Sequence, residues 1–311
     1  MLKALSYLLE YGPRLSAWVL LTKATRRVGL HDIARRCARR KDKAALKIVK
    51  PLVKLAVKTS CEERPVQPSD YVWTMWWQGE SKMPRSVKAC IESQRRYLEG
   101  RHVVITEENV KDYLELPAYI RQRVREGSLD ITHLSDLIRF ELLYHYGGLW
   151  IDATVMVTAP FSVPNKQRLW TWKEPMPQIS CISKGRWCIG LIYTPKDHAF
   201  ARYMCDITAA FWLEHSQLID YHVTDLFIAG ALRRHPLFAR EWEVLNYRHG
   251  LYGNTKRLQK EGSTKHMEAF YHAAPLHYVT WKKAYPLVTS AGKPTVMQNL
   301  LDEFAPDAAL S

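Results

Sequence analysis

The 311-residue sequence has only six cysteines, and no two of them are separated by just two residues. Without such a CxxC pair, a structural zinc site of the zinc-finger type is not indicated. A chain of this length can bury an adequate core without disulfides. We therefore expect reduced thiols and a cytoplasmic protein.

Long apolar runs are also missing. The longest uncharged stretch in the first 60 residues is 15–22, far short of the roughly 20 apolar residues that a membrane-spanning helix needs. Glu10 and Arg14 interrupt the apolar start of the chain, and no small-residue cleavage site follows, so a secretory signal is not predicted. Walker A sequences, GxGxxG sequences and internal repeats are absent as well.

Acidic residues are scarce at the N-terminus. Residues 1–60 hold 15 of the 45 Lys and Arg residues but only three acids, Glu10, Asp32 and Asp42. This segment therefore has a formal charge of +12, and residues 61–311 contribute only +2 to the total of +14. A uniformly basic nucleic-acid-binding domain is not indicated, and we expect no nucleic-acid partner. The asymmetry indicates a local contact with an anionic surface.

The lysines at positions 43, 47, 50, 54 and 58 share one face of a predicted helix, in which Pro51 predicts a kink or boundary. Residues 1–60 then either bind an anionic membrane surface or pack on the protein's own core with these lysines in water. The basic cluster at 35–41 favours the membrane.

The proline-containing run 61–70 predicts a linker between an α-helical basic segment, 1–65, and a second domain, 66–311. Strands predicted at 71–77, 102–106 and 149–151 alternate with helices at 84–99 and 131–146. This order is typical of an α/β fold with a mostly parallel sheet. Ligands bind such sheets beyond the carboxyl ends of the strands, and Asp152 directly follows one predicted strand.

The densest polar cluster is in residues 133–155. Asp136 and Arg139 are three residues apart on a predicted helix, which Gly147 and Gly148 end before the strand that leads to Asp152. Such a cluster can bind sugar hydroxyls and a divalent cation. The alternative interpretation is an ordinary helix ion pair followed by a plain helix stop.

The run SDLIRFELLYHYGGLWIDATV resembles the central motif of the capsular polysaccharide synthesis family, which is similar to DxD-type glycosyltransferases such as yeast initiating mannosyltransferases and glucosylating bacterial toxins. The motif residues are Ser135, Asp136, Arg139, Tyr146, Gly147, Gly148 and Asp152. Segments 76–93, 103–117, 218–228 and 276–283 resemble other landmarks of the family, so the resemblance spans roughly residues 70–285.

The resemblance implies a GT-A type, Rossmann-like fold and transfer of a sugar from a nucleotide-sugar donor, expected to be a UDP-sugar. The acceptor would be a growing capsular or surface polysaccharide or a lipid-linked glycan. The resemblance would place the protein at the inner face of the bacterial cell membrane, as a peripheral protein. A non-catalytic sugar-nucleotide-binding scaffold of a capsule assembly complex is the alternative.

The resemblance also implies roles for particular residues. Asp152 would lie near the diphosphate and a metal ion, with His277 as a further metal ligand. Asp225 would be a catalytic base or an acceptor-binding acid, although a helix-surface acid is the alternative. His277 and Trp281 could instead simply pack. The donor-binding residues would be Trp76, Trp77, Gln78, Ser135, Asp136, Arg139, Gly148 and Trp281.

One position departs from the DxD pattern. Thr154 stands where the second acid is usual, and a neutral hydroxyl is a weaker ligand for a hard cation. Either Mn²⁺ or Mg²⁺ binds through Asp152, the diphosphate and His277, or cationic side chains stabilise the departing diphosphate instead.

Overall fold

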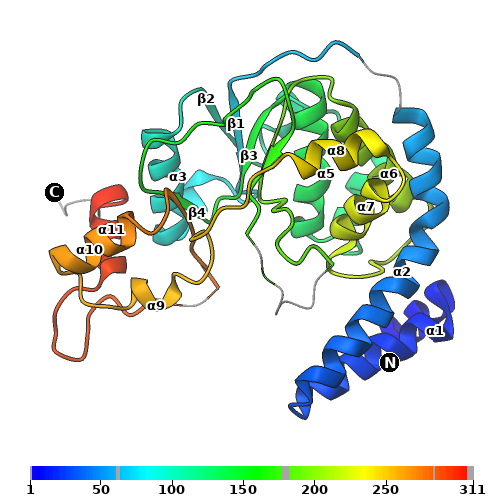
Figure 1. Ribbon diagram of the computed structural model, residues 1–311, viewed down its shortest axis with the longest axis horizontal. Helices are drawn as coiled ribbons and strands as arrows, with labels where there is room; N and C mark the ends of the chain where they lie inside the picture. The colour runs from blue at the N-terminus through cyan, green and yellow to red at the C-terminus, as the bar shows by residue number, and fades with distance from the viewer. Residues whose placement is uncertain (1, 61–63, 175, 177–181, 283, 307–311) are drawn as a thin grey trace.

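The computed structural model describes residues 2–60, 64–174, 176, 182–282 and 284–306 (Figure 1). The helices are α1 (Leu2–Arg27), α2 (His31–Ser60), α3 (Arg85–Tyr97), α4 (Ala118–Arg125), α5 (Ile131–His145), α6 (Ala199–Glu214), α7 (Val223–Leu232), α8 (Pro236–Glu243), α9 (Thr255–Leu258), α10 (Thr264–Tyr271) and α11 (Val296–Phe304). The strands are β1 (Tyr71–Met75), β2 (Arg101–Ile105), β3 (Gly148–Ile151), β4 (Val155–Val157), β5 (Trp170–Thr171), β6 (Leu191–Thr194) and β7 (Leu276–Tyr278). Short 3₁₀ turns lie at Glu80–Lys82 and Val110–Asp112.

The central sheet has five strands in the order β2-β1-β3-β6-β5. β1 pairs in parallel with β2 and β3, whereas β6 is antiparallel to both of its neighbours. β4 and β7 form a separate antiparallel pair. The predicted mixed α/β fold with a mostly parallel sheet is confirmed. The direction of β6 was not predicted.

Both faces of the sheet are buried, and successive strand residues serve opposite layers. Trp73 and Trp150 point into the core that contains α5 and α6, whereas their neighbours Val72 and Leu149 join a second cluster. Figure 1 shows α5, α6 and α7 on one side of the sheet and α3 with α11 on the other. Burial of both faces explains why these strands are apolar without a polar alternation.

The link between α5 and β3 determines where Asp152 lies. α5 ends at His145 with Tyr146 as its C-cap, and Gly147 follows with φ 66°, the left-handed conformation that commonly stops a helix. The chain then turns directly into β3, whose last residue, Ile151, precedes Asp152. The predicted helix stop at the glycine pair is confirmed.

The N-terminal residues form a helical hairpin of α1 and α2. The second half of α2 packs against α6 and α7, with Val49, Leu52 and Val53 buried in the shared core. The five lysines between positions 43 and 58 are exposed, and α2 continues through Pro51. Within the part of the chain that the structure describes, no helix is long and apolar enough to cross a membrane.

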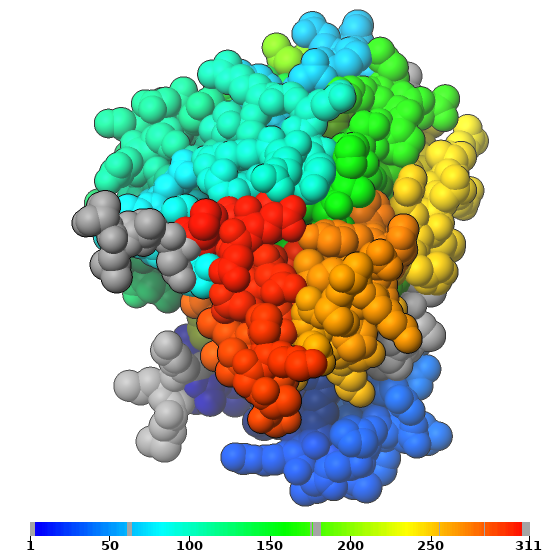
Figure 2. Space-filling view, turned by 90° about the vertical axis from the view of Figure 1, so that its left-hand side faces the viewer, coloured from blue at the N-terminus to red at the C-terminus, as the bar shows by residue number. Residues whose placement is uncertain are grey.

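The C-terminal residues cover the opposite side of the molecule. Figure 2 shows α9, α10 and α11 gathered in one lobe beside α3, with the N-terminal hairpin at the lower edge. Buried residues of α3 and α11 share a cluster with Met156 of β4. β4 and β7 thereby connect this lobe to the end of β3, and β7 carries Tyr278 toward Asp152.

Candidate active site

A cavity of 390 Å³ opens at the carboxyl ends of β1 and β3, as expected for the ligand site of such a sheet. Its walls come from the ends of these strands, the first turns of α5 and α7, and the residues before β6 and after β7. Nine predicted site residues line it: Trp76, Trp77, Gln78, Ser135, Asp136, Arg139, Asp152, Asp225 and Trp281. Two do not, Gly148 and His277.

The first turns of α5 present the central charged residues. The Asp130 side chain caps this helix by accepting a hydrogen bond from the backbone N–H of His133 at 3.0 Å. Helical spacing then places Ser135, Asp136 and Arg139 along the cavity wall.

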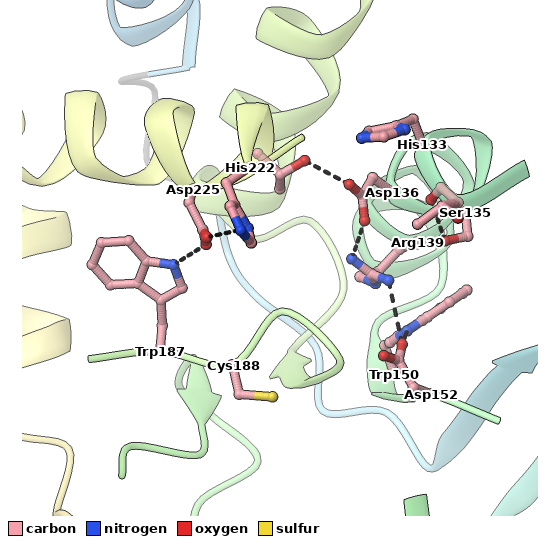
Figure 3. Close-up of polar contacts among 12 residues, drawn as sticks. His133, Ser135, Asp136, Arg139, Trp150, Asp152, Trp187, Cys188, His222 and Asp225 are labelled. Atoms are coloured by element: carbon pink, nitrogen blue, oxygen red, sulfur yellow. Dashed lines mark hydrogen bonds and ion pairs between the residues drawn. The ribbon is translucent and has the colours of Figure 1, made fainter. Parts of the chain in front are cut away.

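Three charged side chains form a chain across the cavity (Figure 3). Arg139 Nη1 donates to Asp136 Oδ1 at 2.5 Å, and Arg139 Nη2 lies 3.4 Å from Asp152 Oδ1. Thr224, at the start of α7, donates to Asp136 Oδ2 at 2.7 Å. The ion pair within α5 is therefore not an isolated helix-surface pair, because it extends to β3 and α7.

The guanidinium at the centre of this chain is buried. Arg139 is 3% exposed, and its Cζ lies 4.7 Å from the ring centre of Trp150. Arg139 Nε is buried, and within the described part of the chain it has no hydrogen-bond partner. An unpartnered buried donor costs free energy unless a ligand or water satisfies it. The arrangement thus offers a hydrogen-bond donor beside two carboxylates.

Besides Arg139, two aromatic side chains contact the carboxylate of Asp152. Trp150 Nε1 donates to Oδ1 at 2.9 Å, and Tyr278 Oη donates to Oδ2 at 2.7 Å. Burial, with the Asp152 carboxylate beside it, raises the pKa of Tyr278 well above its ordinary value, so the phenol stays protonated. Tyr278 was not predicted from the sequence, although it lies next to His277 in segment 276–283, which resembles a landmark of the family.

Gly190 leaves the space in which this carboxylate lies. A Cβ at position 190 would be 2.0 Å from Tyr278 Oη and 2.3 Å from Asp152 Oδ2. The backbone N–H of Asp152 also donates to Gly190 O at 2.8 Å. The glycine is required here by close approach, and no sequence pattern indicated it.

The structure does not bring His277 to the cavity, in contrast to its predicted role as a metal ligand. Its side chain is fully buried and stacks on Phe270, with 4.0 Å between ring centres. Asn254 Nδ2 lies 2.9 Å from its Nδ1, and Thr158 Oγ1 lies 3.1 Å from its Nε2. Burial lowers the pKa of His277 to about 4. Because neighbours on a strand face opposite sides, Tyr278 rather than His277 faces the site.

Gly148 is likewise away from the cavity, although it was predicted to bind the donor. It begins β3, at the opposite end of the strand from Asp152. A Cβ at this position would be 2.4 Å from Tyr71 O, and φ is 109°. The physical reason for the glycine is the close pairing of β3 with β1.

Two tryptophans meet at one edge of the cavity. The rings of Trp76 and Trp281 are 5.5 Å apart in an edge-to-face arrangement, and Trp281 is 46% exposed. Trp76 Nε1 is buried and has no hydrogen-bond partner among the residues that the structure describes. Trp76 and Trp77 follow the last residue of β1, so the predicted strand 71–77 ends at Met75, two residues early. This edge offers flat apolar faces and an unpaired donor.

At the wall that α7 contributes, Asp225 is paired inside the protein (Figure 3). Trp187 Nε1 donates to Asp225 Oδ1 at 2.6 Å, and His222 Nδ1 lies 3.4 Å from Oδ2. The hydrogen bond with Asp225 raises the pKa of His222, which is half-exposed and lines the cavity. His222 was not predicted from the sequence. Its position three residues before Asp225 could have indicated that the two side chains are close.

Cys188 also lines the cavity, and its thiol is buried. Tyr252 Oη lies 3.3 Å from Cys188 Sγ. Burial raises the pKa of Cys188 to about 11, so the thiol is protonated at neutral pH. This environment is unlike that of a nucleophilic cysteine, whose pKa is lowered by cations or a helix N-terminus.

The acids and histidines that line the cavity are not gathered around one metal position. No group of three or more His, Cys, Asp or Glu side chains arranged to hold a metal occurs among the described residues. Asp152 and Thr154 line the cavity and supply one carboxylate and one hydroxyl. This donor set fits a Mg²⁺ or Mn²⁺ ion that takes its remaining ligands from substrate phosphates and water, as Mg²⁺ commonly does.

The fold and the cavity define a mixed α/β protein with a polar ligand site at the carboxyl ends of its parallel strands. Residues 26–299 match the family described as capsular polysaccharide synthesis protein, and the chain belongs to that family. The resemblance seen in the central motif is thereby confirmed.

Two curated proteins are similar over part of the chain. One is the O-glycosyltransferase PaGT of Phomopsis amygdali, 28% identical over 103 residues, which are 30% of this chain and 25% of that protein. The other is the O-glycosyltransferase braB of Annulohypoxylon truncatum, 31% identical over 99 residues, 29% of this chain and 24% of that protein. The matches thus span about a quarter of each relative. The solved structure named PaToxG Glycosyltransferase aligns with 86% of this chain and 95% of its own, at 13% identity and a TM-score of 0.39.

Proposed function

We propose that the protein is a glycosyltransferase that moves a sugar from a nucleotide-sugar donor to a capsular or other surface polysaccharide or a lipid-linked glycan. The observation that carries the proposal is the chain Asp136–Arg139–Asp152 inside a cavity at the strand ends. Membership of the capsular polysaccharide synthesis family and partial similarity to two proteins named O-glycosyltransferases support it.

In this proposal the α5 wall binds the donor. The lone pairs that remain on Asp136 accept hydrogen bonds from sugar or ribose hydroxyls, and Ser135 adds a polar contact at the same wall. Gln78, which follows β1, adds another from the strand ends. Trp76 and Trp281 pack against the flat base of a UDP-sugar, and Trp77 extends this surface. Arg139 orients both carboxylates and supplies positive charge near the diphosphate.

Asp152 is the proposed ligand of a Mn²⁺ or Mg²⁺ ion, together with the diphosphate and Thr154. Such an ion supplies positive charge that stabilises the leaving diphosphate. Asp225 and His222 lie on the acceptor side of the cavity. There Asp225 holds the His222 ring, and the pair binds or deprotonates the acceptor hydroxyl. The proposal extends to a GT-A type arrangement of the domain.

The test compares Asp152→Asn and Asp136→Asn with the wild type and with Asp112→Asn, an exposed acid outside the cavity. Donor binding is measured by calorimetry over UDP-, GDP- and CMP-sugars, and donor hydrolysis is measured with and without Mn²⁺. We expect selective binding of a UDP-sugar and a loss of turnover of about 10-fold to 100-fold in the two cavity variants, because each removes a charged hydrogen-bonding group.

Wild-type turnover in both cavity variants would contradict the assignment of Asp136 and Asp152 to the active site. Donor binding without turnover, across a panel of glycan and lipid-linked acceptors, would instead favour a sugar-nucleotide-binding scaffold. If Asp112→Asn loses as much turnover as the two cavity variants, the losses reflect a general effect of removing an acid on the fold.

A further inference from the structure

One end of the N-terminal hairpin extends away from the body of the protein. We call residues 14–40 the distal hairpin; they comprise most of α1 after its kink at Gly12, the turn, and the first ten residues of α2. Figure 1 shows the turn between the two helices at the end that points away from the sheet, and Figure 2 shows the hairpin at the lower edge of the molecule.

An exposed apolar stripe follows the outer side of this segment. Leu20, Leu21 and Val28 are 66%, 45% and 70% exposed, and Leu30 and Ile33 across the turn are 49% and 46% exposed. Along α1 the stripe consists of Ala17, Leu20, Leu21 and Ala24, spaced so that they lie on one helix face, and Val28 follows directly after the helix. The opposite face carries the buried residues Leu15 and Thr22. α1 therefore has one apolar face in the protein and a second in solvent.

Positive charge surrounds this stripe. The distal hairpin contains eight Lys and Arg residues and a single acid, Asp32, which pairs with Arg35. By helical spacing, Arg14 and Arg27 flank the stripe on either side. The basic residues are Arg14, Lys23, Arg26, Arg27, Arg35, Arg36, Arg39 and Arg40, all exposed.

The other end of the hairpin is attached next to the cavity. Tyr7 Oη donates to Ile219 O at 2.6 Å, Glu10 accepts from the backbone N–H of Ser216 at 2.8 Å, and Lys41 pairs with Asp220 at 2.5 Å. The chain that these contacts hold, 216–220, continues directly into Tyr221 and His222 of the cavity wall. The hairpin is thus connected to the side of the cavity that carries Asp225.

We propose that the distal hairpin docks on an anionic lipid bilayer. Its exposed leucine, valine and isoleucine side chains enter the boundary of the acyl chains, and its cations contact the headgroups. A second copy of this chain does not fit, because it would bring eight further cations against the same surface. The lysines at 43–58 fit this contact less well, because Val49, Leu52 and Val53 beside them are buried in the core that α2 shares with α6 and α7. Leu55, 57% exposed, is the large apolar side chain left in solvent there.

When the distal hairpin is bound to the bilayer, the side of the cavity that is proposed to bind the acceptor lies toward the membrane, where a lipid-linked glycan is found. This last step rests on the proposed function, whereas bilayer binding itself requires no turnover. The two can therefore fail separately.

The experiment is co-sedimentation of the full chain with vesicles of phosphatidylcholine, with or without phosphatidylglycerol. An apolar variant carries Leu20→Ser, Leu21→Ser and Val28→Ser, and a charge variant carries Arg27→Gln, Arg36→Gln and Arg39→Gln. The matched control removes three charges from the body-packed half of α2, by Lys43→Gln, Lys47→Gln and Lys54→Gln. Circular dichroism verifies the fold of each variant.

We expect the wild type to bind anionic vesicles, the charge variant to bind them about 100-fold more weakly, and the control to lose less than about threefold. The apolar variant loses binding at least tenfold. Absence of wild-type binding, or equal losses in the charge variant and its control, overturns the proposal. So does a dimer in sedimentation velocity that the apolar variant abolishes. Donor binding without vesicles is measured in parallel, and its absence would count against the proposed function alone.

Discussion

Tyr278 donates its phenolic hydroxyl to Asp152 across a distance of 2.7 Å, from the end of β7 to the residue that follows β3. A hydrogen bond to a carboxylate contributes about 1.5–3 kcal/mol. It fixes Oδ2 of a carboxylate whose Oδ1 is contacted by Trp150 and Arg139. Tyr278 is therefore expected to position the carboxylate on which donor binding depends.

Tyr278→Phe removes this hydrogen bond and keeps the ring. We expect kcat/KM for the donor to fall about tenfold or more, with only a small change in the midpoint of thermal unfolding. The matched control is Tyr252→Phe, whose ring stacks on Tyr278 but whose hydroxyl contacts Cys188. Equal activity of Tyr278→Phe and wild type would show that the other contacts of Asp152 suffice.

Gly190→Ala introduces a methyl group where the structure has Asp152 Oδ2 and Tyr278 Oη within 2.3 Å. The carboxylate must move, so we predict loss of donor turnover beyond that of Tyr278→Phe. Gly262→Ala is a suitable control, because its Cβ would meet Asn299 Nδ2 at 2.4 Å outside the cavity lining. Turnover assays and thermal unfolding of both variants separate displacement of Asp152 from general strain; similar activity losses in both would contradict the prediction.

His277 makes stability depend on pH. Burial lowers its pKa from the ordinary 6.5 to about 4, so folding favours the neutral ring. Its contribution to the free energy of unfolding is complete above about pH 6.5. As the pH falls toward 4, the unfolded state takes up a proton that the folded state does not, and the unfolding free energy drops by roughly 3 kcal/mol. Urea unfolding of wild type and His277→Gln at pH 7.5, 5.5 and 4.5 tests this. The difference in unfolding free energy between them should narrow as the pH falls.

The same variant distinguishes a packing role from metal binding. His277→Gln should be less stable than the wild type at pH 7.5, yet bind the donor with the same dependence on Mn²⁺. Unchanged stability combined with weaker binding of Mn²⁺ would restore the metal-ligand hypothesis.

Nine residues of the cavity could be predicted from the sequence, but Tyr278, His222 and Gly190, which complete it, could not. The spacing of Asp136 and Arg139 and the glycine pair after α5 are local features, so their placement could be predicted. The choice between His277 and Tyr278 depends on which face of β7 meets Asp152, which alternation alone does not determine. Gly190 reaches the site only because β6 runs antiparallel to β3, a direction that leaves no local signature.

Asp225→Asn should lower the pKa of His222. The Asp225 carboxylate is the main cause of the raised pKa of this imidazole, and the amide of Asn removes its charge while keeping a similar shape. A titration of the His222 ring by NMR measures the shift directly. Asp112→Asn, an exposed acid outside the cavity, should leave the titration unchanged. A pKa that does not fall in Asp225→Asn would mean that the 3.4 Å contact is not formed in solution.

Thr154→Asp tests how the protein handles a divalent cation. Thr154 and Asp152 both line the cavity, so the variant places a second carboxylate beside the first. Hard cations bind more tightly as the number of charged oxygen ligands rises. We expect Mn²⁺ affinity in the presence of UDP to increase about tenfold, and turnover to become more sensitive to chelation. Thr154→Asn, which adds only a neutral oxygen, should gain much less. If calorimetry finds the same Mn²⁺ affinity in wild type and both variants, the cation is not held at Asp152, and the charge of Arg139 is left as the means of stabilising a departing diphosphate.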